Sequence, residues 1–308
     1  MIVTIVGVGG VGGYIGLRLA ESGDDVRFLA RGRTVDALRS RGLSVATPAG
    51  IRTLSDVRVS ESASDLGQAD LIIVTVKIYD LAAVAKTLGP LLGRETAVLP
   101  LQNGVDAHDI ITEALQHDLV LKGTVSIKSH VSAPGVIVCK SPFCRIKVGP
   151  GHPSAAIKAA AVAEHLKQSD GIDAVFSRHI DRELWLKFLM LSSFSAVSCM
   201  ARATIGEVRA NRDAYALVVD AAEEATRVGR ALGIDLPNDI GEAVYKQIVD
   251  MPRDGRPSML EDLEAGRRLE LDWLSGAVVR LGAKVGVPTP IHSVAHAALS
   301  IHAQGHAR

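Results

Sequence analysis

The stretch GVGGVG, residues 7–12, decides how the first part of this chain folds. It follows an apolar run, residues 1–6, which predicts a buried strand. It precedes residues 14–20, whose apolar positions have helical spacing. A strand, a GxGxxG turn and a helix in this order are the fingerprint of a dinucleotide-binding turn. The alternative is a glycine-rich turn in some other α/β protein.

Each glycine of this turn has an expected task. Gly7 permits the tight turn, Gly9 lets the backbone approach a pyrophosphate, and Gly12 lets the helix pack close to the strand. The amide groups at the start of the following helix, together with the positive end of its dipole, can hold phosphate oxygens. We therefore expect Gly7, Gly9, Gly10 and Gly12 to bind the cofactor.

The next predicted strand, residues 25–30, bears on the choice of cofactor. An NAD site usually has Asp or Glu where this strand ends, about 20 residues after the glycines, to accept hydrogen bonds from the ribose 2′-hydroxyl. This chain has Arg31 there and Arg33 close behind. A guanidinium can hold a 2′-phosphate with two parallel hydrogen bonds. The sequence favours NADPH over NADH, unless both arginines are ordinary solvated loop residues.

Length and composition exclude several classes of protein. The 308 residues are enough for two domains, and Lys plus Arg (34) equals Asp plus Glu (34), which argues against a nucleic-acid partner. No apolar run is expected to cross a membrane, and the N-terminal apolar residues are used as a strand. The three cysteines lack CxxC spacing, which favours reduced thiols, no metal site and a cytoplasmic protein.

The first half of the chain alternates strand-like and helical runs, as in a mostly parallel, doubly wound sheet. Strands are expected at residues 1–6, 25–30, 44–45, 57–59, 71–76, 97–101, 119–131, 135–139, 145–148 and 174–176. Helices are expected at residues 81–92 and 154–167. The predicted fold of residues 1–178 is therefore α/β, an N-terminal Rossmann-like domain.

After residue 178 only helical periodicity remains. The expected helices are residues 180–194, 213–232, 238–251, 270–285 and 290–301. Residues 179–308 are thus predicted to form an all-helical substrate domain, and a ligand cleft between two such domains is the default expectation. The apolar helix faces could also form a homodimer, although core packing would use the same faces.

Lys187 is the most informative residue of the second half. The helix predicted around it has an apolar face: Ile180, Leu184, Phe188 and Leu191. Since a helix turns by about 100° per residue, Lys187 falls inside this face. A lysine removed from water gives up its proton more readily, as a general acid requires. The alternative is a solvated i,i+4 pair with Glu183.

Glu270 poses the same question on the helix predicted for residues 270–285. Its core face is expected to contain Leu274, Ala277, Leu281 and Val285, and Glu270 begins this face. The alternative is a first-turn carboxylate that the helix dipole stabilises.

Three further polar residues are candidates for the site. Lys77 ends one apolar strand and Asn103 follows the next, where open α/β sheets bind ligands. The alternatives are a surface lysine and a turn residue before Gly104. Ser258 could instead be an N-cap with Glu261 at N3. We interpret His292, His296 and His302 as solvated and without acidic partners.

Several of these motifs, in this order, resemble the ketopantoate reductase (2-dehydropantoate 2-reductase) family over essentially the whole chain. The matching pieces are the GxGxxG turn with Arg31, residues 76–77, residues 102–104, residues 183–187, residues 258–262 and residues 270–272. The resemblance implies an NADPH-dependent oxidoreductase that reduces a small 2-oxo acid, most simply ketopantoate to pantoate in pantothenate biosynthesis.

The resemblance also implies roles for individual residues. Lys187 matches the general acid, and Glu270 matches a glutamate that engages the substrate hydroxyl. Lys77 and Asn103 match residues near the nicotinamide and the substrate. Ser258 matches a serine that binds the substrate carboxylate. Arg31 matches the residue that contacts the 2′-phosphate.

The chain departs from the family pattern after Lys187. In the family, two asparagines that help to hold the substrate are expected four and eight residues further on. This chain has Leu191 and Ser195 at these positions instead. Leu191 offers no hydrogen bond, so substrate selectivity can differ strongly. A related hydroxy-acid or polyol-phosphate dehydrogenase and a non-catalytic NADPH sensor remain alternatives.

Overall fold

The computed structural model describes residues 1–240 and 250–305, and the chain divides into two compact units. Unit 1 consists of Met1–Gln102 and Asp106–Ile180. Unit 2 consists of Asn103–Val105 and Asp181–Arg308. The short segment Asn103–Val105 therefore packs with the helical unit, although the residues on both sides of it belong to unit 1.

A parallel five-stranded sheet forms the centre of unit 1, as the alternating pattern predicts. Its strands, in spatial order, are β5 (Arg58–Ser60), β2 (Asp25–Leu29), β1 (Ile2–Val6), β6 (Leu71–Val74) and β7 (Ala97–Pro100). Strands β1, β6 and β7 are almost completely buried, which suits their near-continuous apolar sequences. The order reverses at β1, since β2 lies on one side of it and β6 on the other. Such a reversal is where open α/β sheets bind ligands.

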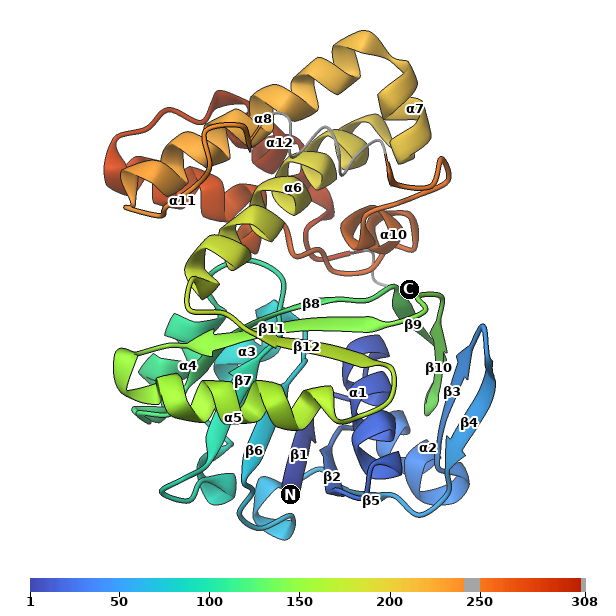
Figure 1. The fold of residues 1–308 in the computed structure, drawn as a ribbon. Helices are drawn as coiled ribbons and strands as arrows, with labels where there is room; N and C mark the ends of the chain where they lie inside the picture. The colour runs from blue at the N-terminus through green and yellow to red at the C-terminus, as the bar shows by residue number, and fades with distance from the viewer. Residues whose placement is uncertain (241–249, 306–308) are drawn as a thin grey trace. The chain divides into compact units, whose positions relative to one another are not determined.

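Two smaller sheets complete unit 1. One contains β4 (Gly50–Leu54), β3 (Leu43–Thr47), β10 (Val136–Cys139) and β9 (Ser129–Ala133), and the other contains β12 (Ile172–Phe176), β11 (Cys144–Pro150) and β8 (Leu121–Ser126). Helix α1 (Gly10–Glu21) packs against both β2 and β10, so it lies between two sheets. Helix α5 (Ala156–Lys167) runs across β11 and β12 (Figure 1). The remaining helices of unit 1 are α2 (Arg33–Arg41), α3 (Ile78–Ala85) and α4 (Ala107–Leu115).

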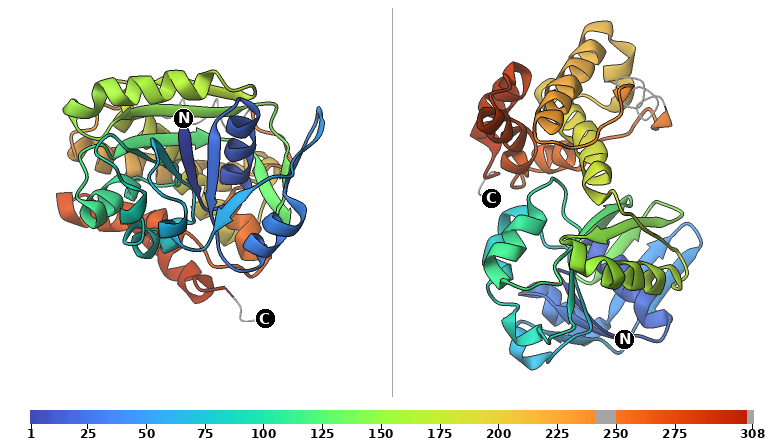
Figure 2. Two further views of the ribbon diagram at one scale, coloured as in Figure 1. Left: turned by 90° about the horizontal axis from the view of Figure 1, so that it is seen from below. Right: turned by 60° about the vertical axis from the view of Figure 1, so that its left-hand side comes forward.

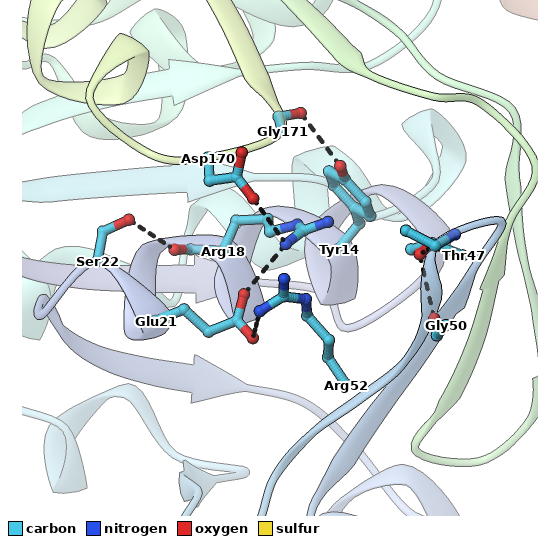
Figure 3. Close-up of polar contacts among 10 residues, drawn as sticks. Tyr14, Arg18, Glu21, Ser22, Thr47, Gly50, Arg52, Asp170 and Gly171 are labelled. Carbon is cyan, nitrogen blue, oxygen red and sulfur yellow. Dashed lines mark hydrogen bonds and ion pairs between the residues drawn. The ribbon is translucent and has the colours of Figure 1, made fainter.

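Polar contacts of two buried side chains, Tyr14 and Arg18, fix helix α1 in place (Figure 3). The Arg18 guanidinium pairs with Glu21 at 3.2 Å and with Asp170 at 3.5 Å, and it lies over the Tyr14 ring. The Tyr14 hydroxyl donates a hydrogen bond to the carbonyl oxygen of Gly171 at 3.1 Å. These bonds hold α1 to the turn before β12 and thereby hold the glycine turn at its start.

Unit 2 is helical in its described part (Figure 2). Its elements are α6 (Ile180–Ala201), α7 (Ile205–Ala210), α8 (Arg212–Ala231), α10 (Ser258–Glu264), the 3-10 helix η4 (Leu271–Trp273), α11 (Ser275–Val285) and α12 (Pro290–Leu299). Helices α8, α11 and α12 pack on one another. The buried core of the unit includes Trp185, Phe188, Val228 and Val278.

Helix α6 is longer than predicted. It continues past residue 194 to Ala201, and residues 192–199 are all buried. Two serines of this interior stretch satisfy their hydroxyls within the helix, because Ser192 and Ser193 both donate to the carbonyl oxygen of Leu189. Contrary to expectation, α6 is long and apolar enough to cross a membrane, but 61% of its apolar window is buried inside the protein, as in a core helix.

Several predicted boundaries were wrong. The helix expected at residues 81–92 is α3, which begins at Ile78 and ends at Ala85, and a separate 3-10 helix around Pro90 follows it. The strand expected at residues 119–131 is two strands, β8 and β9. Strand β4 and helices α2, α4, α7 and α10 were not predicted. The helix expected at residues 238–251 lies mostly outside the described residues.

The histidine interpretation was also wrong. His292 is completely buried, where its Nδ1 lies 3.3 Å from Ser275 Oγ and its Nε2 lies 3.0 Å from the carbonyl oxygen of Ala221. Burial lowers the pKa of His292 to about 4. His296 has an acidic partner, Asp272, at 2.8 Å. A helical wheel drawn for one helix could not reveal these partners, because they lie on other elements.

Candidate functional site

The glycine turn is as tight as the sequence predicts. Gly7 has φ +95°, in the left-handed region that favours glycine. A Cβ atom on Gly12 would lie 2.1 Å from the Gly7 carbonyl oxygen, so the helix packs too closely there for any side chain. A Cβ atom on Gly9 would meet nothing within 4 Å. Space is therefore open beside Gly9, the N-cap residue of α1, whereas a Cβ atom on Gly10, the first helical residue, would lie 2.8 Å from the Ser129 carbonyl oxygen.

Lys77 lies beside this turn in unit 1. It is the N-cap residue of α3, half-buried, at the carboxyl end of the β6 segment. A Cβ atom on Gly7 would lie 2.8 Å from the Val76 nitrogen, so residues 76–77 run next to the glycines. Gln102 braces the same segment, because its Nε2 donates to the carbonyl oxygens of Val74 and Val76 at 3.0 and 3.1 Å. This role of Gln102 was not predicted, because its partners lie on another strand segment.

Arg31 lies two residues after the end of β2, with 69% of its side chain exposed. Its Nη2 lies 3.7 Å from Asp80 Oδ2. The neighbouring Gly32 N–H donates to Glu61 Oε1 at 2.6 Å. Sequence reasoning missed both carboxylates, because Glu61 follows β5, a short strand that pairs with β2, and Asp80 lies on α3.

In unit 2, three residues from distant parts of the sequence form one hydrogen-bonded chain. Lys187 Nζ donates to Asn103 Oδ1 at 3.0 Å, and Asn103 Nδ2 donates to Glu270 Oε2 at 3.3 Å. An amide suits this middle position, since one end accepts from the ammonium and the other donates to the carboxylate. The structure therefore brings together the two predicted catalytic residues through a third predicted residue.

The backbone around Asn103 explains why this segment packs with unit 2. Gly104 has φ +91°, and a Cβ atom there would lie 3.0 Å from the Trp273 carbonyl oxygen. Glu270 immediately precedes the 3-10 helix that contains Trp273 and is only 4% exposed. It does not begin a helix face as expected, because α11 starts later, at Ser275, after an irregular residue, Leu274. Its burial comes from this turn.

Other predicted site residues are not part of this chain of hydrogen bonds. Ser195 is completely buried, and its hydroxyl has no hydrogen-bond partner among the described residues. Leu191 is half-buried on α6. Ser258 is exposed as the first residue of α10, and the N-cap is Pro257, so the alternative N-cap role is wrong. Within residues 1–240 and 250–305, no group of three His, Cys, Asp or Glu side chains could hold a metal ion.

Comparison with known families accounts for both units. The family model for ketopantoate reductase PanE/ApbA matches residues 3–152, and the model for the C-terminal part of ketopantoate reductase PanE/ApbA matches residues 179–303. The chain belongs to the ketopantoate reductase family. Its α/β fold with a helical second part is the fold of this family of NAD(P)-dependent oxidoreductases.

Individual relatives agree with this assignment. The chain is 29% identical over 311 residues to a 2-dehydropantoate 2-reductase of Mesorhizobium japonicum, with 94% of each chain covered. It is 29% identical to the crystal structure of a PanE/ApbA family ketopantoate reductase from Ralstonia eutropha, with a TM-score of 0.89 and 98% of each chain covered. A D-mandelate dehydrogenase structure with NADH and anilino(oxo)acetate shares the fold at 22% identity, 98% coverage of each chain and a TM-score of 0.90.

Proposed function

We propose that this ketopantoate reductase family member is an NADPH-dependent reductase of a small 2-oxo acid, with ketopantoate as its substrate and pantoate as its product. The observation that carries the proposal is the hydrogen-bonded chain from Lys187 through Asn103 to Glu270. A lysine ammonium held in a fixed direction beside a buried carboxylate suits protonation of a ketone.

The residues of unit 1 fit a dinucleotide. The open space beside Gly9 and the first amides of α1 suit a pyrophosphate, and Lys77 lies at the same edge of the sheet. Arg31 is exposed at the end of β2, where it can reach a 2′-phosphate. The bound cofactor would supply a hydride to the carbonyl carbon of the substrate.

Lys187 would act as the general acid. As the carbonyl carbon gains the hydride, negative charge develops on the ketone oxygen, and the Lys187 ammonium stabilises this charge and delivers the proton. The 2-oxo acid thereby becomes a 2-hydroxy acid, and Lys187 recovers its proton from solvent. Asn103 orients the ammonium, because it accepts one of the three N–H bonds of Lys187.

Glu270 would hold the substrate by accepting a hydrogen bond from the distal hydroxyl group of the substrate. Glu270 is 4% exposed, and its Oε2 accepts a hydrogen bond from the Asn103 amide, which orients the carboxylate. A buried acceptor of this kind discriminates against a substrate that lacks the hydroxyl. Ser258, which is exposed, is proposed to bind the substrate carboxylate. A contact between Ser195 and the substrate requires the side chains that bury the Ser195 hydroxyl to move.

The test is turnover of NADPH with a panel of 2-oxo acids, followed by the absorbance of the reduced nicotinamide. Lys187→Ala should lower kcat with ketopantoate by about 100- to 10,000-fold and leave NADPH binding intact. Lys284→Ala, which removes an exposed lysine of α11 in the same unit, is the matched control and should retain full activity. NADPH binding without turnover of any acid would instead favour a sensor.

Leu191 supports a second candidate substrate, a 2-oxo acid with an apolar substituent. Leucine stands where the resemblance implies an asparagine, and it is half-buried on α6. The fold neighbour crystallised with anilino(oxo)acetate carries an aromatic group on its ligand. Leu191→Asn separates the two candidates. If ketopantoate is the substrate, the variant should keep or gain activity toward ketopantoate. If the substrate is an acid with an apolar substituent, the variant should lose activity toward that acid.

A further inference from the structure

The turn between β2 and α2 carries two hydrogen-bond donors that face carboxylates. Strand β2 ends at Leu29, Ala30 is still bonded to the neighbouring strand through the Ser60 carbonyl oxygen, and the chain then turns at Arg31 and Gly32. Gly32 has φ +56° and is the N-cap residue of α2. Its N–H and the Arg31 guanidinium are the donors that a group bound at the end of β2 would meet.

Both donors are engaged by acidic side chains from other elements. The Gly32 N–H donates to Glu61 Oε1 at 2.6 Å, and Arg31 Nη2 lies 3.7 Å from Asp80 Oδ2. Glu61 directly follows β5, whose Ser60 pairs with Leu29 of β2, so its position beside the turn is set by the register of the sheet. Two carboxylates therefore face this turn, although the only charged residues within the turn's own sequence are arginines.

These carboxylates have opposite effects on the two nicotinamide dinucleotides. A 2′-phosphate carries about two negative charges, must compete for both donors and is repelled by Glu61 and Asp80. A ribose 2′-hydroxyl has no charge and can donate a hydrogen bond to a carboxylate, which is the task of the acidic residue in NAD sites. The same groups that weaken NADPH binding can therefore support NADH binding.

We propose that Glu61 and Asp80 set the cofactor specificity of this enzyme, and that they give it substantial use of NADH despite Arg31. The proposal rests on the proposed binding of the dinucleotide at the glycine turn. It adds that the choice at the ribose depends on a balance between one arginine and two carboxylates contributed by β5 and α3.

The experiment compares the dissociation constants of NADPH and NADH, measured by fluorescence titration of the full chain. Glu61→Gln and Asp80→Asn keep the shape and one acceptor oxygen of each side chain and remove its charge. Each should tighten NADPH binding by about tenfold at low ionic strength, leave NADH binding unchanged or weaker, and show a smaller effect in high salt. Asp36→Asn, at an exposed carboxylate in the first turn of α2, is the charge-matched control and should change neither constant.

The outcomes separate this inference from the proposed function. If the unaltered protein binds neither dinucleotide, the proposed function fails. If it binds them but Glu61→Gln and Asp80→Asn shift both constants equally, or if Asp36→Asn reproduces their effect, the carboxylates do not set specificity. A protein that already binds NADPH a thousandfold more tightly than NADH would also overturn the inference.

Discussion

Lys187 and Asn103 lie 84 positions apart in the sequence, and the Lys187 ammonium donates a hydrogen bond to the Asn103 side-chain oxygen at 3.0 Å. This bond is possible because residues 103–105 pack with the helical unit, although the residues on either side of them belong to unit 1. Asn103 thereby joins Lys187 within unit 2.

The hydrogen bond between Asn103 and Glu270 should couple these two residues energetically. Asn103→Ala and Glu270→Gln are each expected to lower kcat/KM, since each removes one link of the chain. The double variant should lose less than the sum of the two losses in free energy, with a coupling of about 1 kcal/mol or more. Steady-state kinetics with the preferred 2-oxo acid measures this cycle. The pair Asn103→Ala and Lys284→Ala should be additive, and strict additivity of the first pair would contradict this coupling.

Gly12 and Gly9 should respond differently to alanine. A Cβ atom on Gly12 would lie 2.1 Å from a backbone oxygen, so Gly12→Ala should destabilise the protein by about 1–3 kcal/mol. Gly9→Ala meets no atom within 4 Å and should leave the melting temperature nearly unchanged, while its methyl group obstructs the pyrophosphate and weakens dinucleotide binding. Thermal unfolding and fluorescence titration measure the two effects. If Gly9→Ala and Gly12→Ala destabilised the protein equally, the space beside Gly9 would be too small for a methyl group.

His292 should make stability depend on pH. Its pKa is lowered by burial from 6.5 to about 4 in the folded state, so between these values the unfolded chain binds more protons than the folded one. The free energy of unfolding therefore keeps its full value above pH 6.5. It falls by up to about 3 kcal/mol as the pH drops toward 4. Urea unfolding across this range should show a steeper fall in the free energy of unfolding for the unaltered protein than for His292→Gln. Parallel curves would mean that His292 is not buried in its neutral form.

Glu224 should stabilise the start of α12. Its buried carboxylate accepts the backbone N–H groups of Ile291 and His292 at 2.8 and 3.1 Å. Glu224→Ala leaves these donors without their acceptor in the interior and should cost about 1–3 kcal/mol. Glu223→Ala, at the exposed neighbouring position, should change the free energy of unfolding by less than about 0.5 kcal/mol. Urea denaturation compares the two, and similar losses would count against this role.

Patterns local in sequence predicted much of the fold. The apolar runs that become β1, β6 and β7 and the glycine turn after β1 are visible because strand burial and turn geometry depend on neighbouring residues. The end of α6 was predicted too early, because four serines interrupt its apolar pattern although all of them are buried: Ser192, Ser193, Ser195 and Ser198. Helix α11 was predicted to begin too early, because the irregular backbone at Leu274 leaves no trace in the apolar spacing.

By itself the sequence determined the kind of protein: a dinucleotide turn, a parallel sheet, a helical second part and a lysine on an apolar helix face. Only the tertiary structure decided which groups meet. It joined Lys187, Asn103 and Glu270 by hydrogen bonds, buried His292, and set Glu61 and Asp80 against the Arg31–Gly32 turn. The physical reason is that periodicity reports which side of one element is buried, whereas these contacts depend on how separate elements pack.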